Sequence, residues 1–158
     1  MPSRHEGACA RALAAVCLVF TVLVLPAHAA DGLVTKKSAH SVADTMDRLV
    51  TILKERELVV FSRIDHAKGA TRVGLTLRPT ELVIFGNPKA GTRLMQSRQT
   101  VGIDLPLKAL AWQDDQGQVW LAYNDPAHLA ARHGIGDRDD LIGNITGALD
   151  RITNAAIE

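Results

Sequence analysis

The amino-acid sequence predicts an α+β fold for this chain of 158 residues. Short runs rich in Val, Ile and Phe predict strands, and longer stretches with apolar residues at helical spacing predict helices. Strands and helices do not alternate regularly, which favours α+β over a parallel, doubly wound sheet. No internal repeat, low-complexity tract or linker interrupts the chain, so we expect one domain behind an N-terminal leader.

Residues 1–29 have the features of a secretory signal peptide. Arg4 and Arg11 supply positive charge, and the uncharged stretch from Ala12 to Leu25 is mostly apolar. The sequence Ala27-His28-Ala29 has the small-x-small pattern of a cleavage site. A spanning helix needs about 20 apolar residues, more than this stretch offers. We therefore expect cleavage after Ala29 and a periplasmic or secreted protein with no membrane association afterwards.

Removal of this leader changes the chemistry available to the chain. Both cysteines, Cys9 and Cys17, lie in it, so residues 30–158 offer no disulfide, cysteine nucleophile, zinc thiolate site or iron–sulfur cluster. The leader also carries two arginines and one glutamate, which lowers Lys plus Arg from 18 to 16 and Asp plus Glu from 17 to 16. This balance gives no reason to expect a nucleic acid or an anionic membrane as partner.

The first half of the mature chain predicts a strand, a long helix and a second strand. Leu33 to Ser38 is the first strand. Ser41 then fits a helix N-cap with Asp44 as its capping-box partner. An apolar stripe at helical spacing follows, and Leu58 to Ile64 is rich in Val and Phe and predicts the second strand. The stripe consists of Val42, Met46, Leu49 and Leu53.

The middle of the chain predicts a short helix at His66 to Val73 and a third strand at Glu81 to Phe85. We interpret Gly86 to Arg93 as a structured loop, in which the glycines allow positive φ, and expect one or two helical turns from Leu94 to Thr100. Leu107 to Trp112 and Val119 to Tyr123 then predict a hairpin, joined by a polar turn that ends in Gly117.

Two helices complete the prediction. Asp125 is suited to cap the first, Pro126 to begin it and Gly134 to end it. The second covers Asp137 to about Ala156, with early aspartates that complement its dipole.

Several short blocks of the mature chain resemble the bacterial and archaeal family known as Domain of Unknown Function 302. The most specific block is Phe85 to Thr92, and the resemblance extends over about Thr35 to Gly136. The other blocks are Ile64 to Ala67, Val73 to Leu75, Asp104 to Lys108, Tyr123 to Pro126 and Arg132 to Gly134. Family members usually have Gly before the second strand, where this chain has Glu57.

The resemblance implies a two-layer domain with an antiparallel sheet and its long helices on one face, in the order β-α-β4-α. It implies no established reaction. On this basis we expect a family-like domain at residues 30–136 and an additional C-terminal helix at residues 137–158.

The stretch GNPKAGTR, from Gly86 to Arg93, raises the question of a nucleotide-binding loop. A P-loop needs Lys directly after the second Gly, and this chain has Thr92 there. Two hypotheses remain: a structured turn, or a small-anion site. The residues considered for ligand binding are Gly86, Asn87, Lys89, Gly91, Thr92, Arg93, Asp104 and Asn124.

Asp65 and His66 are the candidate catalytic pair, because an Asp near a His can orient an imidazole for acid–base work at a strand end. The alternative is a capping Asp followed by a surface His. His128 and His133 are five residues apart, which does not place them on one helical face, so we predict no metal site and no cofactor.

Three functional hypotheses follow. The first is a non-enzymatic binding or interaction domain, because the chain has an export signal, no thiols after it, a neutral charge and no complete catalytic set. We expect it to form a homodimer, since apolar side chains on both faces of Val119 to Asn124 favour a partner or ligand there. The second is a small enzyme in which Asp65 and His66 act beside an anion held by Gly86 to Arg93. The third is a metal accessory protein using His66, His128 or His133.

Overall fold

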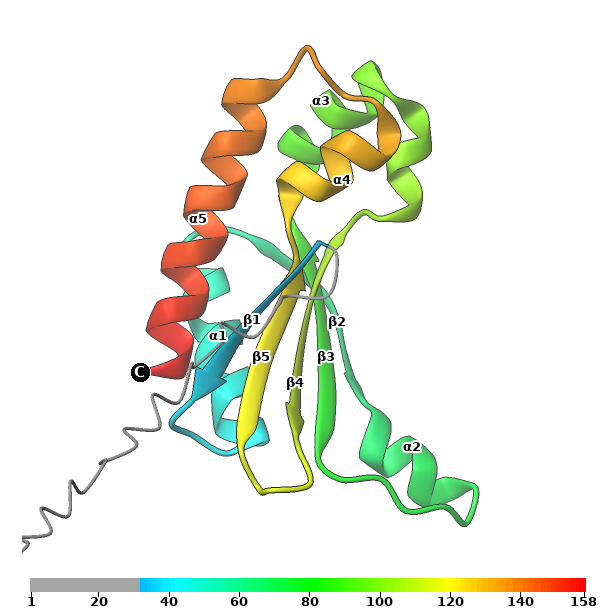
Figure 1. Ribbon diagram of the computed structural model, residues 1–158, viewed down its shortest axis with the longest axis vertical. Helices are drawn as coiled ribbons and strands as arrows, with labels where there is room; N and C mark the ends of the chain where they lie inside the picture. Colours follow the sequence, from blue (N-terminus) through cyan, green and yellow to red (C-terminus); the bar gives the residue numbers. More distant parts are fainter. Residues whose placement is uncertain (1–31) are drawn as a thin grey trace, which may run out of the picture.

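A computed structural model describes residues 32–158, so the predicted signal peptide lies outside the described residues. Its centre is a five-stranded antiparallel sheet in the order β1-β5-β4-β3-β2, which leaves β1 and β2 at the two edges (Figure 1). The predicted antiparallel α+β class is therefore confirmed. The strands are β1 (Leu33–Ser38), β2 (Val59–Asp65), β3 (Thr80–Gly86), β4 (Leu107–Gln113) and β5 (Val119–Asn124).

Helices α1 (Val42–Glu55) and α5 (Asp139–Ile157) cover one face of the sheet. Strand side chains alternate between the two faces, and those on this face, such as Val83, Ala109 and Leu121, are fully buried. They pack against the predicted apolar stripe of α1 and against the C-terminal half of α5. This main core holds the sheet and both long helices together.

Helix α1 begins as the sequence predicts. The Ser41 hydroxyl accepts a hydrogen bond from the Asp44 backbone N–H at 3.1 Å and donates to the Asp44 carboxylate at 2.7 Å. At its other end, Glu57 has a φ of 57°, in the left-handed region that favours glycine. A glycine at this position would adopt the same φ without strain.

Beyond one end of the sheet lies a small layer that we call the cap. It consists of α3 (Pro88–Ser97), the 3-10 helix η1 (Gln99–Ile103) and α4 (Pro126–His133), all at the top of Figure 1. A second hydrophobic core lies here, built from Leu94, Val101, Ala130, Ile135 and Ile142. Ile142 belongs to the N-terminal half of α5, so this one helix contributes to both cores.

The interpretation of Gly86 to Arg93 as a loop is corrected by α3. Asn87 is the N-cap and Pro88 the first helical residue, so Lys89 to Arg93 are helical. Neither Gly86 nor Gly91 has a positive φ. The Asn-Pro pair that suggested a turn is equally the signal of a helix start, because proline lacks the N–H that this position leaves unpaired.

At the opposite end of the sheet, α2 (His66–Arg72) and the following loop project from the body as an arm. None of the seven residues of α2 is buried. The short helix predicted at His66 to Val73 is confirmed, and the Asp65 carboxylate caps it by accepting from the Lys68 N–H at 2.8 Å.

Helix α5 is an integral part of the domain. Leu149, Ile152 and Ala156 are buried in the main core, and Lys36 of β1 donates to Asp150 and Asn154 of α5. The C-terminal helix expected as an extension thus completes the layer that covers the sheet. No packing boundary separates it from the residues before it.

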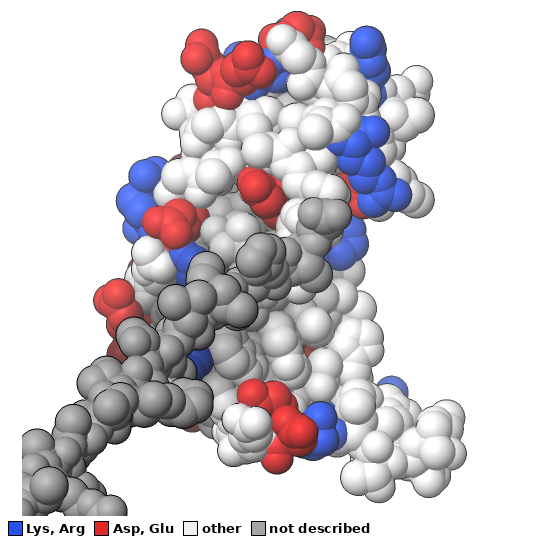
Figure 2. Space-filling view, in the orientation of Figure 1, with Lys and Arg blue, Asp and Glu red and all other residues white. Residues whose placement is uncertain are grey.

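The second face of the sheet carries Trp112 and Trp120, which lie opposite each other in the β4–β5 register. Lys37 stacks over the Trp120 ring, with Nζ 5.4 Å from its centroid. In the view of Figure 2, basic and acidic side chains are interspersed over the surface. Across residues 32–158, every helix is too short or too polar to cross a lipid bilayer.

Candidate functional site

An apolar pocket lies where the two hydrophobic cores meet. Its volume is about 370 Å³. Phe85, Leu149 and Ile152 line it from the main core, and Leu94 and Val101 line it from the cap. We call this space the cap pocket. It exists because the sheet and cap are joined through α5 without their side chains filling the volume between them.

Helix α3 forms one wall of the cap pocket. The Asn87 side chain accepts from the N–H groups of Lys89 and Ala90 at 3.0 and 3.1 Å, which fixes where this helix begins. Gly91 lies where the helix approaches the loop before β4: a Cβ on it would be 3.7 Å from Cδ1 of Leu105. The short side chains of Ala90 and Gly91 thus keep the pocket open along this wall.

The lining of the cap pocket is almost entirely apolar. Among the described residues that line it, Asn87 and Thr92 are the only ones with polar side chains, and both are exposed at the rim. None of the lining residues within 32–158 is charged. A polar group placed deep inside would lose its hydrogen bonds to water and find no replacement, so the interior favours hydrocarbon or aromatic groups.

The ligand-binding residues considered from the sequence divide into two sets. Gly86, Asn87, Gly91 and Thr92 line the cap pocket. Lys89 and Arg93 do not: they are the two members of Pro88–Met95 outside the lining, and their spacing places both on the outer surface of α3. Since Asn87 already accepts from the first free N–H groups of α3, an anion bound here would depend on these two side chains.

Asp104 belongs to a polar cluster that stabilises the cap. Its carboxylate lies 2.6 Å from Nε2 of His133 and 3.2 Å from Nη1 of Arg132. The other imidazole nitrogen, Nδ1, lies 3.1 Å from the Thr100 hydroxyl. The side chains of Asp104 and His133 are only 13% and 8% exposed. This cluster fastens α4 to η1. The pairing of Asp104 with His133 was not predicted from the sequence, because the two residues are 29 positions apart.

Asn124, at the end of β5, lies at the cap end of the sheet but does not line the cap pocket. It pairs with Leu33 in the β1–β5 register and is exposed. The following Asp125 caps α4 by accepting from the Ala127 N–H at 2.9 Å, as predicted. Its neighbour Asn124 therefore sits on the strand that leads into the cap.

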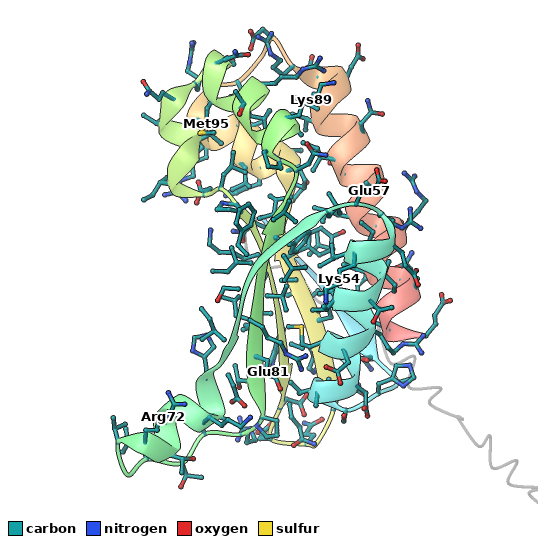
Figure 3. All side chains as sticks on the ribbon, turned by 180° about the vertical axis from the view of Figure 1, so that it is seen from behind. Lys54, Glu57, Arg72, Glu81, Lys89 and Met95 are labelled. Atoms are coloured by element: carbon teal, nitrogen blue, oxygen red, sulfur yellow. The ribbon has the colours of Figure 1, made fainter. Side chains whose placement is uncertain are left out.

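Asp65 and His66 lie at the far end of the molecule. Asp65 pairs with Glu81 at the start of β3, whereas Gly86 at the end of β3 pairs with Val59. Five residues of strand separate these pairs, about 17 Å at ~3.4 Å per residue. Lys89 lies still further on, and Figure 3 shows it at the opposite end from Arg72 of the arm.

Within one chain, the geometry therefore does not support the enzyme hypothesis that joined Asp65 and His66 to the Gly86–Arg93 segment. A general base must come within hydrogen-bond reach of its substrate. The Asp65 carboxylate is engaged locally: the Lys68 backbone N–H, followed by the Lys68 side chain, holds the pKa of Asp65 below its usual value.

The histidines are also dispersed. His66 begins the arm, while His128 and His133 belong to α4 in the cap. Among residues 32–158, no three His, Cys, Asp or Glu side chains come together in a way that could hold a metal ion.

The cap pocket itself was not foreseen from the sequence. Its lining comes from β2, β3, β4, α3, η1, α4, α5 and the loops between them, so no local pattern marks it. The one sequence feature that could have indicated the pocket is the small side chains of the Gly86–Gly91 segment. We interpreted its glycines as positions that allow positive φ and not as residues that leave room for a pocket.

Comparisons with known proteins agree on the fold. Residues 34–152 match the family described as "Domain of unknown function DUF302". The crystal structure of an uncharacterized conserved DUF302 protein from Bacillus stearothermophilus superposes with a TM-score of 0.72 at 20% identity. That match covers 80% of this chain and 99% of the other.

Longer curated proteins also contain a similar segment. A protein named fluoride-specific ion channel FluC 1 from Brucella suis biovar 1 (strain 1330) is 54% identical over 111 residues. The match covers 70% of this chain and 44% of that protein. A FluC 1 protein from Brucella abortus biovar 1 (strain 9-941) matches equally, over 41% of its length. The chain thus spans less than half of these relatives.

Proposed function

The chain belongs to the DUF302 family, and we propose that this member is an exported, non-enzymatic domain that binds an apolar small molecule in the cap pocket. The observation that carries the proposal is the pocket's lining, in which 370 Å³ of space is bounded by apolar side chains and by only two polar ones at the rim. Pockets of about 300–1,000 Å³ with such linings are typical small-molecule sites.

The dimensions and chemistry of the pocket limit the ligand. At about 30 Å³ for each water-sized group, the space takes a ligand portion of about a dozen non-hydrogen atoms. An alkyl chain or a fused aromatic ring system meets these requirements. A polar head group, if the ligand has one, belongs at the rim, where Thr92 and Asn87 are exposed to water.

Export is part of the proposal because of the signal-peptide features of residues 1–29. An exported protein meets hydrophobic molecules in an aqueous compartment, and a recessed apolar site is a means of keeping them in solution. Release of the chain from expressing cells, with mass spectrometry of its N-terminus, tests this point. An N-terminus at Ala30 is the expected result, and an intact Met1 on cell-associated protein would contradict it.

Titration with the fluorescent apolar probe N-phenyl-1-naphthylamine tests binding in the pocket. We expect saturable binding by the wild-type protein. Ala148→Phe places a ring in the pocket, because Ala148 lines it from α5. This variant should weaken probe binding by about tenfold or more, which corresponds to a loss of about 1.4 kcal/mol.

Ala155→Phe is the matched control, since Ala155 is also half-buried on α5 but does not line the pocket. Its probe affinity should stay within about twofold of wild type, a difference well under 1 kcal/mol. Equal probe binding by the Ala148→Phe variant and the wild type, or no saturable binding by the wild type, would refute the proposal.

A further inference from the structure

The large apolar side chains that are exposed in residues 32–158 gather along one edge of the molecule. This edge runs from the cap, along β2, to the arm, and it lies on the right of Figure 1. Figure 3 shows Met95 of the cap and Arg72 of the arm projecting on the same side of β2. The exposed residues are Val59, Phe61 and Ile64 on β2, Val73, Leu75 and Leu77 after α2, and Met95 and Ile103 in the cap.

Strand β2 forms the middle of this edge, and within residues 32–158 no strand pairs with its outer side. Natural edge strands are usually protected by proline, by outward charges or by a bulge. Here a bulge between Val60 and Ser62 is present, but the strand has no proline. Its one basic residue, Arg63, turns inward to Asp47 and to Glu81. Of these protective devices only the bulge is present, so the rest of the β2 edge is open to pairing with another strand.

The arm supports the same conclusion. Helix α2 has no buried residue, and the loop after it exposes Val73 by 71% and Leu75 by 66%. Apolar side chains on a projecting segment do not stabilise the fold of a single chain, since they stay in contact with water. They gain stability when a second surface covers them.

We propose that two copies of this chain associate through antiparallel pairing of β2 with β2 of the partner, about a two-fold axis near Ser62. A two-fold arrangement requires a surface that is complementary to itself. This edge meets the requirement, because antiparallel pairing brings the arm of one copy beside the cap of the other. Val73, Leu75 and Leu77 then face the exposed Met95 and Ile103 of the second copy.

The charges along the edge are also complementary under this pairing. Glu57 precedes β2, and Lys68 follows it on the arm. The Lys68 side chain is 78% exposed, and its Nζ lies 3.2 Å from the Asp65 carboxylate of the same copy, so Glu57 of the second copy would be a further partner. Antiparallel pairing about Ser62 places these opposite charges of two copies next to each other. A parallel arrangement would instead bring Glu57 near Glu57 and Lys68 near Lys68, which like-charge repulsion disfavours.

The interface is continuous with the cap pocket. Phe61 is 53% exposed on the edge and also lines the pocket, as does Met95 at 36% exposure. The partner's arm would cover both side chains, so association closes this side of the pocket. The dimer is tested by measuring the mass of the protein in solution. This result does not depend on whether the cap pocket binds a ligand.

Light scattering coupled to size-exclusion chromatography of the full-length gene product tests the association. We expect twice the chain mass for wild type. Leu75→Glu and Ile103→Glu each put a charge into the proposed apolar contact, from the arm and from the cap, and each should give a monomer. Both positions are exposed, at 66% and 75%, so the variants should fold, which circular dichroism checks.

Thr35→Glu is the control, because Thr35 is an exposed position on β1, the opposite edge strand. It should remain dimeric. A monomeric wild type would overturn the proposal. So would a dimer that withstands both Leu75→Glu and Ile103→Glu, or one that Thr35→Glu alone disrupts, since the contact would then lie elsewhere.

A cysteine at the two-fold axis tests the register. Paired residues on antiparallel strands have Cα atoms about 4.5–5.5 Å apart, within the range that a disulfide spans. Ser62→Cys should therefore form a covalent dimer on mild oxidation, above the level of wild type treated in the same way. Thr35→Cys should not. Equal cross-linking by the two variants would contradict β2 pairing near Ser62.

Discussion

Single residues decide several features of this protein, and Glu57 is an example. Its φ of 57° lies in a region that costs an ordinary residue about 1–2 kcal/mol. The strain falls at the turn that directs the chain from α1 into β2. Glu57, which stands where the family resemblance leads us to expect Gly, therefore occupies a position that requires a left-handed backbone conformation.

The pair formed by Asp104 and His133 is a second residue-scale determinant. Replacing His133 by Ala leaves a nearly buried carboxylate without its imidazole partner, which costs about 1–3 kcal/mol. We expect His133→Ala to lower the free energy of unfolding by that amount in urea denaturation. His128→Ala is the control on the same helix, since His128 is exposed, and it should change the value by less than about 0.5 kcal/mol.

Equal effects of His133→Ala and His128→Ala would show that the Asp104 pairing contributes nothing to stability. Asp104→Asn provides a further check. It keeps the size of the side chain but removes its charge, so Arg132 loses its ionic partner and His133 loses a carboxylate as its hydrogen-bond partner.

At the scale of elements, α3 shows how a helix can be shaped by the space beside it. Gly91 lies within the helix at ordinary helical φ, where Gly is less stable than Ala by about 0.5–1 kcal/mol. Gly91→Ala should raise the free energy of unfolding by this amount, because its Cβ would meet Leu105 only at an ordinary contact distance of 3.7 Å.

The same substitution narrows the cap pocket, since Gly91 lines it. We therefore expect higher stability together with weaker binding of N-phenyl-1-naphthylamine. Gly143→Ala is a suitable comparison on α5: it has open space around it and does not line the pocket. A Gly91→Ala protein that is destabilised would contradict the described fit between α3 and the loop before β4.

At the scale of the whole molecule, several carboxylates accept hydrogen bonds from other segments and make stability depend on pH. The hydrogen bond from Trp120 lowers the pKa of Asp114, and that from Lys36 lowers the pKa of Asp150. The hydrogen bond from Ser97 likewise lowers the pKa of Asp137. These bonds connect the hairpin turn to β5, α5 to β1, and α3 to the start of α5.

The sign of the pH effect follows from these lowered pKa values. A carboxyl whose pKa is lower in the folded protein stabilises it above the unfolded pKa, about 4, and loses this contribution as pH falls through the folded pKa. We expect the urea midpoint to decrease as the pH is lowered from about 5 to 2. Asp150→Asn should reduce this decrease, whereas Asp115→Asn, at an exposed position, should leave it unchanged. A midpoint that rises with acid would contradict these pairings.

Much of the secondary structure follows from the sequence because its signals are local. Ser41, Asp125, Pro126 and Gly134 act within a few residues of their own positions, and each has the predicted role at a helix end. The hairpin around Gly117 is local in the same sense, with a φ of 82° at the glycine. Asn87 and Pro88 also carry a local signal, but this signal is common to turns and to helix starts. Only the packing of the segment against Leu105 and the cap selects the helix.

The sequence by itself determined the α+β class, the caps and strands, and the absence of thiols from residues 30–158, since these depend on residue type and spacing. Only the tertiary structure decided that His66 and Lys89 lie at opposite ends, through the antiparallel register of β2 and β3. It also decided the cap pocket and the apolar edge. Both form between segments far apart in the chain, where the distance between side chains is set by how sheet, cap and α5 pack together.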